Sequence, residues 1–325
     1  MKLSKSLYTR AIQCQKSLWL KKHNKDVLTP PNAAAQAIFQ NGNEVGDLAC
    51  KLFPNGVEIT YLNTTFQDKI NLTQEYINQG TQNIYEATFE FDGILIMIDI
   101  LNIKDNSVII NEVKSSTQVK DIYLHDASIQ YYVLNGLGYD VKKVNIIHIN
   151  NQYVRDEELD INQLFSIVDV TYEVKELQAN IKNNLEIFRK TLAKEDEPNI
   201  DIGTHCNDPY DCDAKNYCWS HIPNYSIFDI SRLKSQKKFE LYQNGILEFS
   251  QITDINSFSI SQQIQIESEL ENRTIINKEA IKEFVNTLTY PIYHLDFETF
   301  QQAIPEFKGV SPYSQIPFQY SLHIE

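Results

Sequence analysis

Two apolar runs separated by a short polar turn, between Ile98 and Lys114, constrain the fold of this chain more than any other segment. They read IDILNIKDNSVIINEVK, and the turn over 104–107 contains Asp-Asn, which is typical of a β-hairpin. Side chains alternate between the two faces of a strand, so we expect Ile98 and Ile100 on one face and Asp99 on the other. The hairpin therefore predicts a sheet at the centre of the fold.

The polar side chains of this hairpin form a pattern typical of phosphodiester hydrolysis. On the second strand, Val113 is expected to point inward, while Glu112 and Lys114 share the outer face beside Asp99. Two carboxylates supply the hard oxygen ligands that Mg²⁺ and Mn²⁺ prefer. A lysine beside them can orient a water molecule or bind a phosphate. The pattern is short, and an ordinary hairpin with a solvated polar face also produces it.

The composition excludes several classes of protein. At 325 residues, the chain is long enough for two domains with a substantial core in the first. A content of 42% hydrophobic and 11% aromatic residues is typical of a globular protein. No apolar run is long enough to span a bilayer, and the N-terminus lacks the apolar segment of a signal peptide. We therefore expect a cytoplasmic protein without a membrane partner. The net charge of −14 argues against a wholly basic surface.

The periodicity on either side of the hairpin predicts an α/β domain. Helices are expected over 6–22, 32–52, 124–137 and 169–194, and strands over 84–114 and 144–150. Asn32 is a plausible N-cap of the second helix. Glu44 on that helix is either a metal ligand above the sheet or a surface carboxylate. Gln130, on the helix after the hairpin, either contacts DNA or the attacking water or belongs to a polar face.

Three closely spaced cysteines near the end of this region indicate a metal site. Five residues separate Cys206 from Cys212, and five separate Cys212 from Cys218. In a cytosolic chain this grouping favours metal ligation over disulfides, and the bound group would be zinc or an iron–sulfur cluster. The fourth ligand is either His221, which gives a zinc site, or distant Cys14, which gives a four-cysteine [4Fe–4S] site. Three unliganded thiols are the remaining alternative.

The order of these motifs over residues 1–222 resembles the iron–sulfur members of the PD-(D/E)XK nuclease superfamily, which are RecB-like and CRISPR-associated exonucleases. Asp99 resembles the first strand acid of that family, Glu112-Val113-Lys114 its E-x-K motif, and Gln130 the glutamine of the following helix. Glu44 lies where many relatives place a helical metal ligand.

Two features depart from the family pattern. The spacing between Cys206 and Cys212 is wider than in many relatives. The family's Q-x-x-x-Y motif has Leu134 in place of the tyrosine, so Tyr131 or Tyr132 would have to substitute for it.

The resemblance implies a restriction-endonuclease-like α/β core that hydrolyses DNA with Mg²⁺ or Mn²⁺. The metal ligands would be Glu44, Asp99, Glu112 and the carbonyl of Val113, while Lys114 would position the water. A [4Fe–4S] cluster would have a structural role, and the resemblance implies that its ligands are Cys14, Cys206, Cys212 and Cys218.

The C-terminal part of the chain has a second short motif. Residues 231–288 read as short helices, and Tyr293–Phe297 as a buried strand from which Asp296 and Glu298 project together. The segment HLDFET resembles the opening motif of DEDD-type exonucleases, which have a ribonuclease H-like fold. The sequence holds no further acids in the places such a site needs, so we expect a truncated, inactive second site that binds metal weakly.

The expected organisation is a RecB-like nuclease domain over 1–222, a helical linker over 223–289 and the incomplete start of a DEDD-type domain over 290–325. This arrangement resembles a bacterial family of two-nuclease proteins. We expect a DNA exonuclease of repair, recombination or defence that acts on single-stranded or free ends, with or without a helicase or repair partner. The alternatives are a catalytically silent nucleic-acid-binding protein and a zinc-stapled scaffold.

Overall fold

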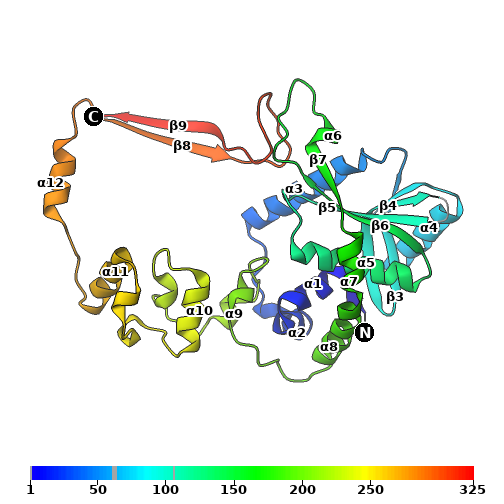
Figure 1. Cartoon of the computed structure of the whole chain (residues 1–325), viewed down its shortest axis with the longest axis horizontal. Helices are drawn as coiled ribbons and strands as arrows, with labels where there is room; N and C mark the ends of the chain where they lie inside the picture. Colours follow the sequence, from blue (N-terminus) through cyan, green and yellow to red (C-terminus); the bar gives the residue numbers. More distant parts are fainter. Residues whose placement is uncertain (1, 61–63, 105–106) are drawn as a thin grey trace. The chain divides into compact units, whose positions relative to one another are not determined.

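The structure is a computed structural model that describes residues 2–60, 64–104 and 107–325 (Figure 1). The chain divides into two compact units. The first comprises Met1–Lys25, Pro30–Asn199 and Thr299–Ile316, and the second comprises Asp26–Thr29, Ile200–Glu298 and Pro317–Glu325. Among the helices of the described residues, none combines the length and the apolarity that crossing a bilayer requires.

A mixed β-sheet forms the middle of the first unit. Its strands are β1 (Leu3–Ser4), β2 (Val57–Glu58), β3 (Asn83–Phe91), β4 (Ile94–Lys104), β5 (Ser107–Lys114), β6 (Asp140–Ile149) and β7 (Phe165–Asp169). Over the described residues, the hydrogen-bonded order is β2-β3-β4-β5-β6-β7, and β1 pairs with β4. The pairs β1–β4, β2–β3 and β5–β6 are parallel, and the other pairs are antiparallel.

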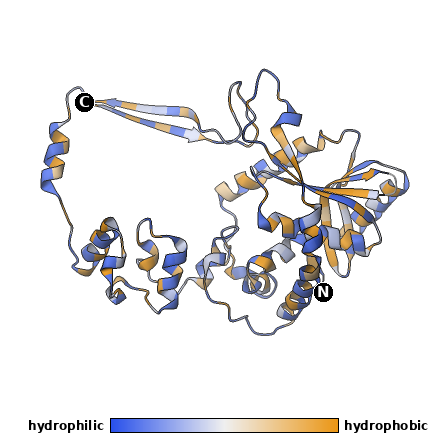
Figure 2. Cartoon of the chain, in the orientation of Figure 1, coloured by the Kyte–Doolittle hydropathy of each residue, from blue (hydrophilic) through white to orange (hydrophobic). Residues whose placement is uncertain are grey.

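Helices cover both faces of this sheet. They are α1 (Lys5–Gln13), α2 (Gln15–His23), α3 (Ala33–Cys50), α4 (Phe66–Asn78), α5 (Asp121–Gly136), α6 (Ile161–Leu164), α7 (Thr171–Glu176) and α8 (Gln178–Leu192). One hydrophobic core lies between the sheet and α1, α5, α7 and α8, and a second lies between the opposite face and α3. Figure 2 shows the hydrophobic residues along the strands between these layers. The predicted α/β class is confirmed, and burial on both faces explains the apolar strands.

The predicted hairpin forms as β4 and β5, with Lys104 opposite Ser107. Its turn residues, 105–106, lie outside the described part of the chain. The expectation that Ile98 and Ile100 share a face is wrong, because Ile98 packs in the core beneath α5 and Ile100 in the core beneath α3.

A backbone irregularity on the neighbouring strand lies beside this change of face. The register of β3 and β4 passes from Tyr85↔Ile100 to Ala87↔Ile98. Glu86, between the two β3 residues, has a φ of +57°, in the left-handed region. The pairing register is the same before and after Glu86, so neither strand has an inserted residue, and Glu86 lies opposite Asp99. The side chains of β4 change faces at Asp99, since Ile98 and Ile100 pack in different cores.

Two predicted long helices are each divided in two. The first breaks at Cys14, whose φ of −159° and ψ of 118° are extended, between α1 and α2. The second breaks at Leu177, between α7 and α8. Hydrophobic periodicity continues across both breaks because the residues on each side bury against the same core. The predicted N-cap is confirmed, since the Asn32 side chain accepts a hydrogen bond from the backbone N–H of Ala35 at 2.9 Å.

The second unit consists of short elements. Its helices are α9 (Lys215–Cys218), α10 (Ser235–Gln243), α11 (Ile260–Leu270) and α12 (Lys278–Asn286), with 3₁₀ turns at Thr204–Cys206, Ile227–Asp229, Phe249–Gln251 and Ile255–Ser257. Two predictions of local structure are confirmed. Gly245 follows α10 with a φ of +76°, and Ser259 forms a capping box with Gln262 at the start of α11.

Strands β8 (Tyr293–Phe300) and β9 (Ile316–Ile324) form a separate two-stranded sheet. The prediction of a strand at Tyr293–Phe297 is confirmed, but the prediction that it is buried is wrong. Leu295 and Phe297 are each 54% exposed. Over the described residues, β8 has β9 as its pairing partner, and a two-stranded ribbon buries little of either face.

Candidate active site

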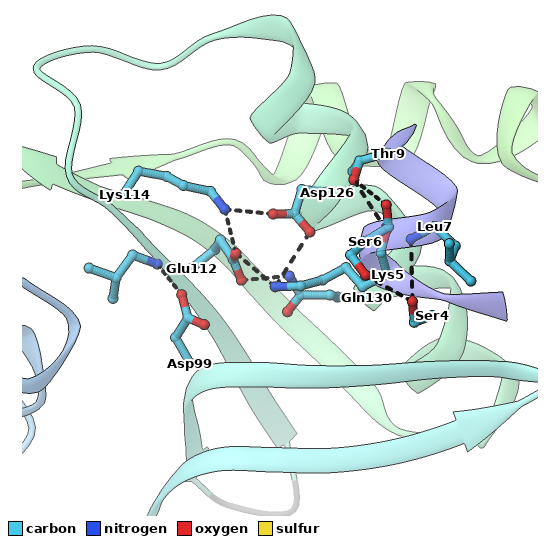
Figure 3. Close-up of polar contacts among 11 residues, drawn as sticks. Ser4, Lys5, Ser6, Leu7, Thr9, Asp99, Glu112, Lys114, Asp126 and Gln130 are labelled. Atoms are coloured by element: carbon cyan, nitrogen blue, oxygen red, sulfur yellow. Dashed lines mark hydrogen bonds and ion pairs between the residues drawn. The ribbon is translucent and has the colours of Figure 1, made fainter. Parts of the chain in front are cut away.

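Five charged or polar side chains from three elements meet above β5 in the first unit (Figure 3). Glu112 and Lys114 come from β5, Asp126 and Gln130 from α5, and Lys5 from the start of α1. Hydrogen bonds and ion pairs join all five. We call this group the charge cluster.

The charge cluster is centred on Glu112, which is 1% exposed. Its Oε1 accepts hydrogen bonds from the Nζ of Lys114 at 2.7 Å and the Nζ of Lys5 at 2.8 Å. Its Oε2 accepts from the Nε2 of Gln130 at 2.6 Å. The expectation that Glu112 and Lys114 share one face of β5 is confirmed by this geometry. The expectation that this is an outer face is wrong, because α5 covers it.

Helix α5 supplies Asp126 and Gln130, which are one turn apart and therefore share a face of the helix. Asp126 is 7% exposed, and its Oδ2 accepts from the Nζ of Lys114 at 2.6 Å. The Nζ of Lys114 also lies 5.3 Å from the centre of the Tyr123 ring, on the same helix. The sequence analysis identified Gln130 and missed Asp126. The i, i+4 spacing of Asp126 and Gln130 on an otherwise buried helix is the signal that could have identified it.

Lys5 is the second residue that the sequence analysis missed. Strand β1 pairs with β4 through Leu3↔Ile94, and Ser4 caps α1 by accepting from the backbone N–H of Leu7. These contacts place Lys5 in the first helical turn, where its Nζ reaches Glu112 and lies 3.4 Å from the Oδ1 of Asp126. No local pattern identifies this residue, because its partners are more than one hundred positions away.

Asp99 lies where the hairpin strands separate. The paired register of β4 and β5 ends at Ile100↔Asn111. Beyond that point the Oδ2 of Asp99 accepts a hydrogen bond from the backbone N–H of Val113 at 2.7 Å. Val113 stands between Glu112 and Lys114, so this bond holds the Asp99 carboxylate against the same segment of β5.

Burial and opposite charges shift the pKa values of the cluster in different directions. Burial and the charge of Glu112 raise the pKa of Asp99 to about 7. Burial also acts to raise the pKa of Glu112, but Lys114 and Lys5 outweigh it and hold that pKa below its usual range. Burial acts to lower the pKa of Lys114, but Asp126 and Glu112 raise it well above the usual value. Lys114 is therefore a fixed cation and hydrogen-bond donor at neutral pH.

The raised pKa of Asp99 predicts a pH-dependent effect of substitution. The unfolded carboxyl has a pKa of about 3.9. Asp99 therefore contributes stability below about pH 4 that is lost as the pH rises through about 7. We expect Asp99→Asn to match the wild-type melting temperature near pH 4 and to exceed it by a few degrees at pH 8, as measured by thermal unfolding in EDTA. A difference that does not change with pH would contradict this assignment.

The donor set and the charge balance fit a divalent cation. With all groups ionised, Asp99, Glu112 and Asp126 outnumber Lys5 and Lys114 by one charge, and their oxygens are the ligands that Mg²⁺ and Mn²⁺ prefer. Asp99 and Glu112 would hold such a cation. Within the described part of the chain, no group of three or more His, Cys, Asp or Glu side chains is arranged to bind a metal ion. Backbone or water oxygens would therefore complete the coordination.

The other predicted residues of the first site lie apart from the charge cluster. Glu44 is exposed on α3 and accepts a hydrogen bond from Gln40 at 3.1 Å. The hydroxyl of Tyr132 donates to Asp92 at 3.0 Å, and Tyr131 packs against the core beneath α5. The structure does not bring these three residues into contact with Glu112 or Lys114.

Helix α3 does place Cys50 close to Asp99. Burial, followed by the charges of Asp47 and Asp99, raises the pKa of the Cys50 thiol to about 12. The thiol is therefore protonated at neutral pH.

The three C-terminal cysteines lie in the second unit, and among the described residues their side chains do not form a group arranged to bind a metal ion. Cys206 and Cys218 pack in one hydrophobic cluster, and the backbone N–H of Cys212 donates to the carbonyl of Cys206 at 2.9 Å. Burial acts to raise the pKa of Cys206, but hydrogen bonds from the His205 side chain and the Gly203 backbone lower it overall. A lowered thiol pKa favours the thiolate that a metal binds.

The imidazole of His221 makes its contact elsewhere in that unit. Its Nε2 lies 2.8 Å from the hydroxyl of Tyr242, which also donates to Asp201. In the C-terminal motif, Asp296 and Glu298 lie on β8 and are exposed.

Comparisons with known proteins give limited similarity. A family model described as "Domain of unknown function (DUF2779)" matches residues 293–325. A search of curated proteins finds no match.

Two solved structures have a similar arrangement over part of the chain. An alkaline exonuclease (LHK-Exo) from Laribacter hongkongensis is 14% identical with a TM-score of 0.35, covering 59% of this chain and 87% of its own. A protein described as SSO0001 is 11% identical with a TM-score of 0.31, covering 69% of this chain and 86% of its own. At these scores, any functional assignment depends on the residues of the site.

Proposed function

We propose that this protein is a metal-dependent nuclease that hydrolyses phosphodiester bonds in DNA. The observation that carries the proposal is the convergence of Asp99, Glu112 and Lys114 on one segment of β5. Asp99 accepts from the backbone N–H between the other two residues, and Lys114 donates to Glu112 at 2.7 Å. Two carboxylates and an ammonium at this spacing suit the hydrolysis of a phosphate ester in water.

Each residue has a distinct proposed role. Asp99, Glu112 and the carbonyl of Val113 would hold Mg²⁺ or Mn²⁺. A cation there would supply Lewis-acid chemistry and lower the pKa of a bound water. Lys114, a permanent cation because Asp126 and Glu112 raise its pKa, donates hydrogen bonds that orient the attacking water or the phosphate. Gln130 fixes the Glu112 carboxylate through its 2.6 Å hydrogen bond.

The proposed substrate is DNA with single-stranded or free ends, and the proposed action is exonucleolytic, in repair, recombination or defence. A helicase or another repair protein is the proposed class of partner. The basic N-terminal segment supports contact with a phosphate backbone, because residues 1–53 carry eight Lys or Arg and three Asp or Glu. Glu44, which is exposed on α3, is proposed as a further metal ligand.

Two further sites belong to the proposal. The three C-terminal cysteines would bind a [4Fe–4S] cluster with Cys14, or zinc with His221. Iron and acid-labile sulfide in anaerobically purified protein support the cluster, whereas about one zinc per chain without sulfide supports the alternative. Asp296 and Glu298 would form the incomplete second site, which we propose to be inactive.

Cleavage of end-labelled single-stranded DNA by anaerobically purified protein tests the proposed function. We expect shortening of the DNA with Mn²⁺ or Mg²⁺, complete loss in EDTA, and recovery when Mn²⁺ is restored. DNA binding that needs no metal, without cleavage, would contradict the nuclease proposal and support a silent nucleic-acid-binding protein. Neither binding nor cleavage, with zinc present, would support a scaffold.

A further inference from the structure

Two members of the charge cluster, Lys5 and Asp126, have no role in the proposed reaction, although each of them contacts a residue that does. Lys114 donates to Glu112 Oε1 and to Asp126 Oδ2, and Lys5 donates to Glu112 Oε1 and lies 3.4 Å from Asp126 Oδ1. Each lysine therefore contacts both carboxylates. The four groups form a closed ring of alternating charge (Figure 3).

The position of Lys5 is unfavourable without this ring. A cation in the first turn of a helix opposes the helix dipole, and α1 has no acidic side chain in that turn to offset it. The side chain is also largely buried, at 21% exposure. The carboxylates of Glu112 and Asp126 compensate for both costs, so Lys5 lies where its charge affects that of the site.

Asp126 helps to hold the ammonium of Lys114 in place. The long lysine side chain has many rotamers, and its ammonium makes a 2.6 Å contact with Asp126 in addition to its contact with Glu112. Two anchors on different elements, β5 and α5, fix the ammonium in one place. Without Asp126, one of these anchors is lost.

We propose that Asp126 and Lys5 are positioning residues for the nuclease reaction, in which Asp126 fixes the ammonium of Lys114 and Lys5 balances the negative charge around Glu112. This inference rests on the proposed function. Its physical consequence is that the two residues set the affinity for the cation in opposite directions. Removing Asp126 lowers the negative charge near the proposed metal ligands, and removing Lys5 increases it.

The experiment compares Asp126→Asn and Lys5→Met with Asp121→Asn, a matched control at an exposed position on the same helix. Mn²⁺ binding is measured by calorimetry without DNA. We expect Asp126→Asn to weaken binding and Lys5→Met to strengthen it, each by about 5- to 10-fold. The double variant restores the charge balance, so its affinity is expected to be close to that of the wild type.

Cleavage kinetics give the second readout. We expect Asp126→Asn to lower kcat by about 10- to 100-fold, which is the usual effect of losing a residue that orients a metal-site group, while KM for DNA changes by less than about twofold. Asp126→Glu, which keeps the charge, is expected to recover part of the loss. Asp121→Asn is expected to match the wild type. If Asp126→Asn lowers kcat no more than Asp121→Asn, or if both cluster variants change Mn²⁺ affinity in the same direction, the inference is wrong.

Thermal unfolding of metal-free protein separates this inference from the proposed function. Wild-type protein that neither binds Mn²⁺ nor cleaves DNA refutes the proposed function, and with it the catalytic part of the inference. The pairing of Asp126 with Lys114 is still tested by Asp126→Asn, Lys114→Met and the double variant. We expect the double variant to lose less melting temperature than the sum of the two single losses. Additive losses would show that Asp126 does not hold Lys114.

Discussion

Replacement of Lys114 with alanine is expected to lower the rate of DNA cleavage by about 10²- to 10⁴-fold, the range typical of a lost proton-transfer or orienting group. The side chain supplies the ammonium that Glu112 and Asp126 hold at 2.7 and 2.6 Å. Alanine leaves the proposed metal ligands in place but removes the donor that orients water or phosphate. Single-turnover cleavage of end-labelled single-stranded DNA with Mn²⁺ measures the loss.

The control for this variant is Lys142→Ala. Lys142 also lies on the sheet of the first unit and forms an ion pair, with Asp140 at 2.7 Å, but its side chain is 61% exposed. We expect Lys142→Ala to cleave DNA at the wild-type rate. Circular dichroism checks that both variants are folded. Equal cleavage by Lys114→Ala and the wild type would contradict the assigned site and indicate another site or a contaminating nuclease.

The part of the site that lies on the hairpin and the helix after it was largely predictable from sequence, and the part supplied by the distant N-terminus was not. Glu112 and Lys114 share a face because strands alternate with a period of two, and Gln130 lies on the helix that packs over them. Asp126 was within reach of the same reasoning, since it is one turn from Gln130. Lys5 was not, because only the pairing of β1 with β4 brings the N-terminus to this end of the sheet.

Backbone conformation accounts for the other differences. The change of face at Asp99 lies opposite a left-handed φ at Glu86, and because Glu86 is not a glycine, no residue type marks this irregularity in the sequence. The break at Cys14 has a similar cause, because hydrophobic spacing continues through an extended residue. The burial of β8 was predicted from its apolar residues. That prediction was wrong, because the burial of a strand depends on which elements cover it.

Replacement of Glu112 with alanine is expected to destabilise the protein by about 3 to 5 kcal/mol, the cost of breaking a buried ion pair by removing one partner. Glu112 is 1% exposed and is the acceptor that Lys5, Lys114 and Gln130 share. Its removal leaves two ammoniums with Asp126 as their remaining carboxylate partner in the cluster. Urea unfolding of the metal-free protein, followed by circular dichroism, measures the change in the free energy of unfolding.

The reason for this loss can be separated from a simple packing defect. If excess positive charge is the cause, the double variant Glu112→Ala with Lys5→Met should be more stable than Glu112→Ala alone, because it removes one of the two ammoniums that then share Asp126. A packing defect would instead grow with the second substitution. Asp140→Ala is the matched control, since its ion pair with Lys142 is exposed and is expected to contribute little. A loss in Glu112→Ala no larger than that in Asp140→Ala would contradict a buried charge cluster, because solvent would then be screening these charges.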